Sequence, residues 1–495
     1  MNRHVDEDAD LGRAQVLLKA GDYANCERIC DRLLRNGNNP DAIAVRALAQ
    51  AHQGRPQQAI TTLEALAEAA ATPTPYWSYA LAASHAAAGD TPRALTLIDA
   101  TLSQHGPNPL LAVFRADLLI ADGRYEDART TLQEQRVAAA DPAAHARLSS
   151  LLLRRGGKPR AALAAVEKGL RSPGLSAPQQ RALLFEQAAV LDSLGRYDDA
   201  FATYTAANRL NRERYDPILH KDAIDRTIRH WSAETFARLP DVAPIGVAPV
   251  LIVGMPRTGS TLLEQMLDCH SAICAVGEGD WLQRAMAELD SYHVERFGTL
   301  ISPAKLDQSA LAGIAERYSS GLPLVPGEGR RTADKTLTNR QLIGAGAKAF
   351  PGLQVLWCQR HPLDTIWSCY CQGFTRNAPY ADLFDIARQY HDSERLLRHW
   401  SDSLGISIHT VAYESMVMRP QETLGAVLAH LRLPWDDACL GFHRSSRRPR
   451  TASQHQVNRP LYQSAVGRWH HYAKHLEPVR RFLASLGHPV EDDGA

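Results

Sequence analysis

Hydrophobic and polar positions follow two different patterns in the two halves of the chain. In the first half, six glycine-containing turn signals recur between helical stretches, and in the second half short β-rich apolar runs alternate with helical patterns. The first pattern predicts helix pairs packed one after another, and the second predicts a parallel sheet flanked by helices. We therefore expect an α-solenoid followed by an α/β domain.

The turn signals of the first half have a nearly constant spacing. Their glycines are separated by 33, 35, 34, 34 and 38 residues, and a small residue follows each glycine by five positions. A glycine permits the left-handed turn between two helices, and a small residue lets the helices lie close together. The longest interval predicts a loop insertion around residues 172–175. The glycines are Gly21, Gly54, Gly89, Gly123, Gly157 and Gly195, and the small residues are Cys26, Ala59, Ala94, Ala128, Ala162 and Ala200.

A period of about 34 residues with this pattern resembles the tetratricopeptide repeat. The resemblance covers approximately residues 8–230 and holds six times. Such repeats stack into a curved solenoid whose concave face usually binds peptides or proteins. We therefore expect a domain over 8–235 that binds a peptide or protein acceptor, or else one that only scaffolds or dimerises the chain. Residues 210–231 predict a capping helix, and three prolines within 239–249 predict a linker over 236–248.

Length and composition narrow the classes of protein. A chain of 495 residues is too long for a single core, and its formal net charge of +1 indicates no general attraction to nucleic acid or membranes. Residues 1–10 lack the apolar core of a signal peptide, and the longest apolar runs have only the length of strands. Neither Cys26 and Cys30 nor Cys369 and Cys371 have a second pair at zinc-site spacing, so we expect packing cysteines in a reducing cytoplasm.

The stretch Leu251–Leu263 is the most informative for function. An apolar strand enters a Gly/Pro loop and a helix leaves it, an arrangement that points backbone N–H groups at one spot and holds phosphate. The spacing from Gly254 to Gly259 fits the first half of a Walker A loop. However, Ser260 stands where the lysine would be, and Arg257 precedes the second glycine by two residues. Such a P-loop-like segment favours a sulfonucleotide over ATP.

A second anion-binding signal follows the predicted strand 353–359. Arg360 stands at the end of this strand, and Ser368 follows eight residues later, two turns into the next helix. Arginine offers a planar pair of donors and serine adds a short third bond, so the two can hold one phosphate from two sides. Strands are also predicted over 250–254 and 406–413, which would bring both signals to the carboxyl ends of one parallel sheet.

With these two signals, residues 248–485 resemble the sulfotransferases that use 3′-phosphoadenosine 5′-phosphosulfate (PAPS). Met255–Thr261 is similar to their 5′-phosphosulfate loop, and Arg360–Ser368 is similar to their 3′-phosphate site. The loop is closer to that of tyrosylprotein sulfotransferases than to that of the cytosolic small-molecule enzymes, which have lysine where Arg257 stands. The resemblance implies a sulfotransferase domain over 249–487, PAPS as co-substrate, adenosine 3′,5′-bisphosphate as product and no metal.

The resemblance also implies roles for individual residues. Arg257 would contact the 5′-phosphate and the bridging oxygen, and Tyr413 would lie near the adenine. Lys335, which precedes Arg360 by 25 residues, corresponds to the lysine in the Lys-Thr-His signature of the cytosolic enzymes. Leu337 replaces the histidine that is the general base in those enzymes. The remaining donors of the loop would be Thr258, Gly259, Ser260 and Thr261.

Another group must therefore take the proton from the acceptor hydroxyl. Glu278 matches the Gly-Glu pair in which tyrosylprotein sulfotransferases carry their catalytic glutamate, and Asp280 is the alternative base. A glutamate carboxylate, with an ordinary pKa near ~4.3, is ionised at pH 7 and can accept a phenol or alcohol proton. Downstream, Ser453 corresponds to a serine at the sulfuryl group and Arg459 to a lysine at the nucleotide.

The leading interpretation is a PAPS-dependent sulfotransferase fused to a tetratricopeptide array, acting on a hydroxyl of a peptide or protein, with tyrosine expected first. A glycan or a small molecule is the alternative acceptor. A P-loop kinase is disfavoured by Ser260, and an adaptor with a degenerate nucleotide domain is the non-enzymatic alternative. Arg447 and Arg448 would recognise acidic residues around the target hydroxyl or else belong to a solvated loop, and Gly467–Trp469 would close over the 3′-phosphate or else only pack.

Overall fold

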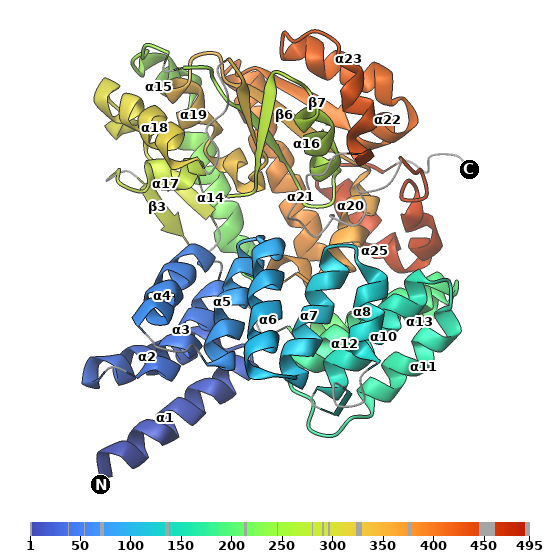
Figure 1. The fold of residues 1–495 in the computed structure, drawn as a ribbon. Helices are drawn as coiled ribbons and strands as arrows, with labels where there is room; N and C mark the ends of the chain where they lie inside the picture. The colour runs from blue at the N-terminus through green and yellow to red at the C-terminus, as the bar shows by residue number, and fades with distance from the viewer. Residues whose placement is uncertain are drawn as a thin grey trace. The chain divides into compact units, whose positions relative to one another are not determined.

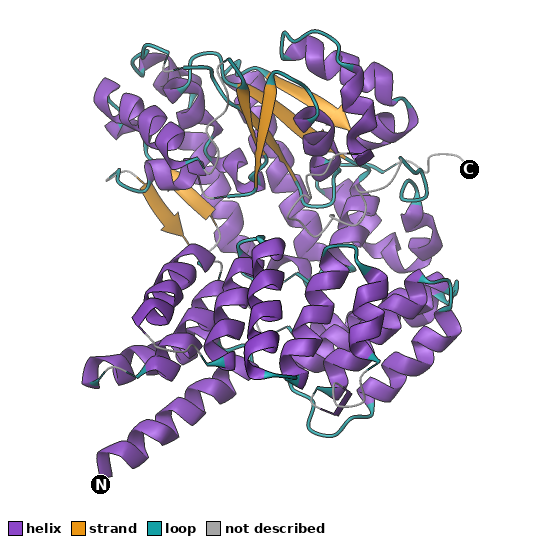
Figure 2. Cartoon of the chain, viewed as in Figure 1, coloured by secondary structure: helices purple, strands orange, loops and turns teal. Residues whose placement is uncertain are grey.

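The computed structural model divides the chain into two compact units, Met1–Asn211 and Arg212–Ala495. Figure 2 shows that the first unit is helical and that the second contains strands as well as helices. The described residues are 2–37, 39–53, 55–69, 74–133, 138–139, 141–211, 215–244, 246–279, 281–289, 292–295, 298–322, 329–374, 378–444 and 461–490.

The first unit is a row of helices packed in consecutive pairs (Figure 1). Most of them begin with a capped first turn, in which an aspartate, asparagine, serine or threonine side chain accepts a backbone N–H. The helices are α1 Asn2–Lys19, α2 Tyr23–Asn36, α3 Pro40–His52, α4 Pro56–Ala69, α5 Pro75–Ala87, α6 Thr91–His105, α7 Pro109–Ala121, α8 Tyr125–Leu132, α10 Pro142–Arg155, α11 Pro159–Leu170, α12 Ala177–Ser193 and α13 Tyr197–Arg209.

The turn pattern predicted for this unit is confirmed. Five of the six turn glycines lie among the described residues, and their φ angles run from +72° to +83°, the left-handed region that glycine tolerates. Gly54 lies outside the described residues. The six small residues that follow the glycines are fully buried between helices. The predicted insertion lies between α11 and α12, where the Ser176 hydroxyl caps the second helix.

The second unit is built around a five-stranded parallel sheet. Its strand order is β2-β5-β1-β6-β7, so β1 lies in the centre. A separate antiparallel hairpin consists of β3 and β4. The strands are β1 Val250–Gly254, β2 Ile273–Gly277, β3 Tyr292–Glu295, β4 Gly298–Ile301, β5 Arg331–Asp334, β6 Gln354–Gln359 and β7 Ile408–Ala412.

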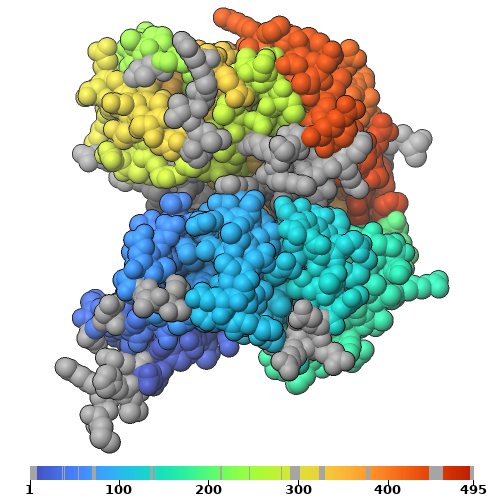
Figure 3. All heavy atoms as spheres, viewed as in Figure 1, coloured from blue at the N-terminus to red at the C-terminus, as the bar shows by residue number. Residues whose placement is uncertain are grey.

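Helices cover both faces of this sheet. Leu251 and Val253 of β1 belong to one core, and Val250 and Ile252 belong to a second core on the opposite face, as the alternation along a strand requires. Helices α22 and α23, orange-red in Figure 3, form one end of the surface of this unit. The helices are α14 Pro217–His230, α15 Ala233–Arg238, α16 Ser260–Asp268, α17 Trp281–Met286, α18 Gln308–Gly321, α19 Ile343–Ala349, α20 Pro362–Tyr370, α21 Leu383–Arg398, α22 Tyr413–Met418, α23 Pro420–His430 and α25 Ala473–Ser485.

Short helical turns of other kinds complete the second unit. The 3₁₀ turn η2 begins three residues after the end of β5. The turns are η1 Pro303–Lys305, η2 Leu337–Gln341, η3 Ala378–Tyr380, the π-turn η4 His399–Ser403, η5 Asp437–Arg444 and η6 Arg468–Tyr472.

The helix predicted to cap the repeat array belongs instead to the second unit, which corrects the predicted boundary at residue 235. This helix, α14, packs against α21 and β4. Trp231 at its end is buried, donates its indole N–H to the carbonyl oxygen of Ile301 at 3.1 Å and meets the Trp400 ring edge-on at 5.8 Å. The apolar face of α14 therefore completes the core of the α/β unit. The end of α15 covers residues 236–238 of the predicted linker, and the described residues from 239 to 248 have no helix or strand.

Three of the five strands in the sheet were predicted. The predicted strands 250–254, 353–359 and 406–413 correspond to β1, β6 and β7, with ends that differ by no more than two residues. The strands β2 and β5 were not predicted. Each has only four or five residues, and β5 reads Arg-Thr-Ala-Asp, which lacks the apolar run expected of a buried strand.

Gly344 provides a test of the core around Trp231. It lies in α19, where a Cβ atom would stand 2.7 Å from the ring of Trp231 and 2.8 Å from that of Trp400. Both rings are almost completely buried. We expect Gly344→Ala to destabilise the protein by roughly 1–3 kcal/mol, because two packed indole rings must move. Chemical denaturation measures the change in the free energy of unfolding.

Gly346, in the same helix, is the matched control. A Cβ atom there would meet Leu353 at 3.5 Å, an ordinary contact distance. Gly346→Ala should therefore be neutral or stabilising by up to ~1 kcal/mol, since alanine favours the helix. Equal destabilisation by the two variants would contradict the packing described for Gly344.

Candidate active site

The loop between β1 and α16 has a backbone that few residues could adopt. Gly254 has a φ angle of +146°, and a Cβ atom on it would stand 2.5 Å from the carbonyl oxygen of Cys358 in the next strand. Gly259 has a φ angle of +89°, and a Cβ atom on it would stand 2.6 Å from the ring of Tyr413. Arg257 also lies in the left-handed region, at +70°, which is uncommon for a residue with a side chain. Strain of this kind concentrates at binding sites.

Hydroxyl side chains line the same loop. Thr258 donates its hydroxyl to the carbonyl oxygen of Met255 at 2.7 Å, which closes the turn. Thr258, Ser260 and Thr261 are buried, and α16 begins at Ser260 without a side-chain cap among the described residues. The backbone N–H groups of the first helical turn are therefore suited to an anion, as the sequence predicts.

The second predicted anion signal lies beside this loop. Arg360 follows β6, which pairs with β1, and Ser368 lies in the following helix, α20. The Nε of Arg257 donates to the Ser368 hydroxyl at 3.1 Å, and Nη1 of Arg360 donates to the carbonyl oxygen of Arg257 at 3.2 Å. The guanidinium of Arg360 also lies over the Tyr413 ring, 4.8 Å from its centre. The two signals thus form a single cluster.

The charges of this cluster favour an anion. Burial lowers the pKa of Arg257, and the positive charge of Arg360 acts in the same direction. Burial also raises the pKa of Tyr413 to about 12, so its ring stays neutral beside the two cations. A bound phosphate or sulfate group would stabilise two guanidinium groups held so close together.

Asp364, in the first turn of α20, organises the same side of the site. Its carboxylate lies 3.4 Å from Nη2 of Arg360 and accepts backbone N–H groups of Gly467 and Trp469 at 2.8 and 2.9 Å. The Trp469 ring is buried and stacks on His361 with 5.2 Å between ring centres. The predicted segment Gly467–Trp469 therefore lies next to Arg360, and its tryptophan packs. Asp364 was not identified from the sequence, because Arg360 precedes α20 and only the structure brings the two side chains together.

A second cluster of charged groups lies at the ends of β5 and β2. Lys335 follows β5 and is fully buried, and its Nζ hydrogen-bonds to Oε1 of Glu278, at the end of β2. The same Nζ lies 3.7 Å from Oε2 of Glu264, a buried residue of α16. The side chain of Glu278 is 46% exposed, so its carboxylate can meet both Lys335 and a second molecule. Glu264 was not identified from the sequence, where it resembles any polar residue of an amphipathic helix.

Asp334, just before Lys335, is a buried carboxylate that holds the backbone after β5. It accepts the N–H of Thr336 at 2.9 Å, the Asn339 amide at 3.1 Å and the Tyr318 hydroxyl at 3.3 Å. Burial raises its pKa to about 6 in spite of these bonds. Thr336 in turn exchanges hydrogen bonds with the backbone of Gly279, next to Glu278. The turn that carries Lys335 is therefore tied to the turn that carries Glu278.

The two clusters lie on either side of β1. Arg360 and Ser368 follow β6 on one side, and Lys335 and Glu278 follow β5 and β2 on the other. The five strands of the main sheet are parallel, so their carboxyl ends meet at one edge of the sheet, where ligands bind in open α/β folds. The loop around Arg257 lies at the centre of this edge.

Some predicted residues cannot be placed. Ser453, Arg459, Asp280, Arg447 and Arg448 lie outside the described residues. Within the part of the chain that is described, no group of three or more histidine, cysteine, aspartate or glutamate side chains could hold a metal ion. None of the described helices is long and apolar enough to cross a membrane.

Comparisons with known proteins identify the two halves of the chain. The sulfotransferase family model matches residues 249–437, and tetratricopeptide repeat models match residues 11–75, 85–152 and 147–213. These matches confirm the predicted order of a repeat array followed by a sulfotransferase domain.

Two curated relatives are similar over part of their length. An uncharacterized protein of Aquifex aeolicus is 28% identical over 337 residues, which are 66% of this chain and 44% of the relative. A protein-tyrosine sulfotransferase of Drosophila melanogaster is 21% identical over 241 residues, which are 44% of this chain and 46% of the relative. The chain thus spans less than half the length of the curated relatives it matches.

Two solved structures also match part of the chain. The sulfotransferase domain of the Synechococcus PCC 7002 olefin synthase is 23% identical, with a TM-score of 0.35, and covers 47% of this chain and 90% of its own. The sulfotransferase STF9 of Mycobacterium avium is 14% identical, with a TM-score of 0.29, and covers 64% of this chain and 94% of its own. By its family matches, this chain combines amino-terminal tetratricopeptide repeats with a carboxy-terminal enzyme domain of the sulfotransferase family.

Proposed function

We propose that the protein transfers a sulfuryl group from PAPS to a hydroxyl acceptor. The observation that carries this proposal is the hydrogen bond from Arg257 to Ser368, which joins the loop after β1 to the Arg360 cluster. A single molecule with phosphate groups at both ends of an adenosine would engage both clusters at once. A Walker-type nucleotide would engage only the loop, which lacks the lysine for its terminal phosphates.

The donor would be held from three sides. Arg257 and the loop donors Thr258, Gly259, Ser260 and Thr261 would bind the 5′-phosphosulfate. Arg360 and Ser368 would bind the 3′-phosphate, with Asp364 orienting the arginine. Tyr413, which packs on Gly259 and under Arg360, would lie near the adenine. Ser453 and Arg459, outside the described residues, remain proposed contacts of the sulfuryl group and the nucleotide.

The acceptor would react on the other side of the loop. Glu278 has an exposed carboxylate at the end of β2, so we assign it the role of general base. Lys335, bonded to Glu278 and buried, would stabilise the charge that develops on the leaving phosphate. Leu337, where the cytosolic enzymes have a histidine base, supports the assignment to Glu278.

We propose a tyrosine of a peptide or protein as the acceptor. The loop sequence and the similarity to the Drosophila protein-tyrosine sulfotransferase support this acceptor. A glycan or small-molecule hydroxyl is the alternative substrate, and an adaptor with an inactive nucleotide domain is the alternative from another class. Sulfation of a peptide library with labelled PAPS, followed by identification of the labelled residue, would distinguish the acceptors.

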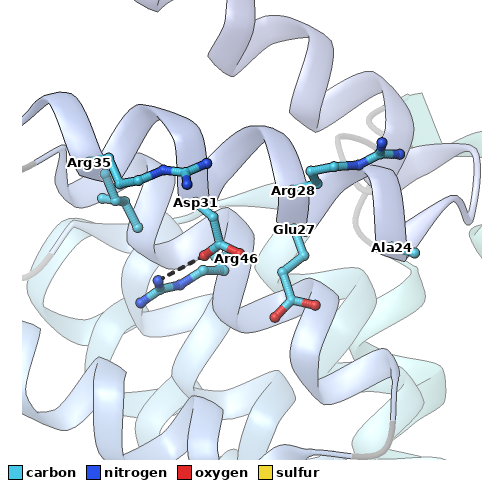
Figure 4. A pocket seen from close by; sticks show the side chains of 7 residues that line it. Ala24, Glu27, Arg28, Asp31, Arg35 and Arg46 are labelled. Carbon is cyan, nitrogen blue, oxygen red and sulfur yellow. Dashed lines mark hydrogen bonds and ion pairs between the residues drawn. The ribbon is translucent and has the colours of Figure 1, made fainter.

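The repeat array would bind the acceptor or another protein. A surface pocket of about 600 Å³ lies on α2 and α3, and Figure 4 shows that charged side chains line most of it. Asp31 of α2 accepts a hydrogen bond from Arg46 of α3 at 3.1 Å within this pocket. Such a lining favours a polar segment over an apolar one.

The eight cysteines are free thiols, which fits the reducing cytoplasm that we propose for the protein.

Nucleotide binding distinguishes the three functions. We expect calorimetry to show tight binding of adenosine 3′,5′-bisphosphate and no comparable binding of ATP, because only the bisphosphate reaches both Arg257 and Arg360. Ser368→Ala should weaken bisphosphate binding by roughly tenfold, the value of about one charge-assisted hydrogen bond. Preferential binding of ATP would indicate a kinase, and binding of neither nucleotide would indicate an adaptor.

Arg257 provides a test of catalysis. We expect Arg257→Ala to lower kcat with PAPS by ~10²–10³, because a preorganised cation at the leaving group is lost. Initial-rate kinetics with labelled PAPS measure the effect. Arg419→Ala, which removes an exposed arginine paired with Glu422 on the surface, is the control and should retain full activity. Near-wild-type turnover of Arg257→Ala would refute the proposed role.

Glu278 provides an independent test of the base. Glu278→Gln keeps the shape and a hydrogen-bond acceptor for Lys335, so bisphosphate affinity should be unchanged. The kcat should fall by ~10²–10⁴, since glutamine cannot take the proton. Glu288→Gln, at an exposed glutamate beyond α17, is the matched control. Full activity of Glu278→Gln would show that another group is the general base, and Asp280 would be the next candidate.

A further inference from the structure

Glu264 is a buried carboxylate that has no role in the proposed binding of PAPS or in the proposed proton transfer to Glu278. It lies in α16, four residues after Ser260, and only 1% of its side chain is exposed. An ionised carboxylate in such surroundings is costly unless a cation and hydrogen bonds compensate it. Among the described residues it forms an ion pair with Lys335, whose Nζ lies 3.7 Å from Oε2 of Glu264.

Lys335 therefore lies within ion-pair distance of two carboxylates that differ in their exposure to solvent. Glu278 is 46% exposed and hydrogen-bonds to Nζ, whereas Glu264 is enclosed by the protein. Lys335 itself has no exposed surface. A fully buried ammonium group requires at least one carboxylate at every stage of a reaction. Glu278 cannot meet this requirement throughout, since a general base loses its negative charge when it takes a proton.

We propose that Glu264 is a positioning residue that serves as the permanent counter-ion of Lys335. This inference rests on the proposed sulfotransferase function and adds to it a residue that touches neither substrate. With Glu264 ionised, Lys335 stays protonated and in place while Glu278 is neutral. The ammonium group then remains available to the leaving phosphate at the moment when that phosphate gains charge.

The charges balance through the reaction. The acceptor oxygen forms a bond to sulfur, the bond from sulfur to the bridging oxygen of PAPS breaks, and adenosine 3′,5′-bisphosphate leaves with the electron pair. The acceptor proton passes to Glu278, which becomes neutral. Before this step Lys335 lies between two carboxylates, and after it the pair of Lys335 with Glu264 is still neutral overall.

Other titratable groups around Lys335 do not replace Glu264. Burial raises the pKa of the Cys358 thiol in β6 to about 12 against the opposing effect of the charge of Lys335, so this thiol stays neutral near pH 7. Asp334, the preceding residue, is occupied by Thr336, Asn339 and Tyr318. Among the described residues, the carboxylates within ion-pair distance of Lys335 are Glu264 and Glu278.

The pH dependence of kcat provides the test. In Glu264→Gln, Lys335 should lose its proton at lower pH, so the alkaline limb of the kcat profile should move down by roughly one pH unit or more, with kcat at neutral pH reduced about tenfold. Glu264→Asp, which keeps the charge at a longer distance, should move the limb part of the way. Binding of adenosine 3′,5′-bisphosphate by calorimetry should stay within a few-fold of the wild-type affinity in both variants.

Controls separate this role from a structural one. Glu186→Gln removes another buried carboxylate, paired with Arg154 in the repeat array, and should lower the unfolding temperature without moving the alkaline limb. If the alkaline limb of the kcat profile of Glu264→Gln lies at the same pH as in the wild-type protein, the inference is overturned. If that variant does not fold, an alkaline limb of Glu264→Asp at the wild-type pH overturns it. If the wild-type protein transfers no sulfuryl group from PAPS, the proposed function fails instead, so the two failures are distinguishable.

Discussion

The parallel pairing of β1 with β6 is the contact on which the candidate site depends. Gly254 pairs with Cys358, so the two strands end at the same level and their loops leave the sheet at one edge. The carbonyl oxygen of Cys358 lies where a side chain on Gly254 would be. This close approach brings Arg257 beside Arg360, although 103 residues separate them in the chain. Without that register, neither arginine alone would distinguish a bisphosphate from any other anion.

The position of β1 in the sheet separates two kinds of charge. On the β6 side, Arg257 and Arg360 form a cationic region that suits a ligand with several phosphates. On the β5 side, Lys335 is held between carboxylates, which suits the movement of a proton. The loop from Gly254 to Gly259, which carries Arg257, lies between the two regions because it follows the central strand β1. Both charged regions therefore lie along one edge of the same sheet.

Much of this arrangement could be predicted from the sequence, and the remainder depends on contacts between distant segments. Turn glycines and small residues repeat along the first unit and carry their own signal, and the loop around Arg257 has a spacing that few other structures require. In contrast, α14 has the amphipathic pattern of any helix, and the burial of Ile224 and Trp231 in the core of the α/β unit shows which unit it joins. Glu264 and Asp364 likewise became informative once their partners Lys335 and Arg360 were located in space. Short, polar β5 escaped detection because burial, not composition, makes it a strand.

The contact between Gly259 and Tyr413 links three strands mechanically. Tyr413 begins the helix after β7, packs on Gly259 after β1, and supports the guanidinium of Arg360 after β6. Even a methyl group at Gly259 would push the phenol ring outward and carry the arginine with it. The loop around Arg257 and the guanidinium of Arg360 consequently share one aromatic ring as a spacer. Gly259, which has no side chain of its own, thus fixes the position of a ring on which the guanidinium of Arg360 rests.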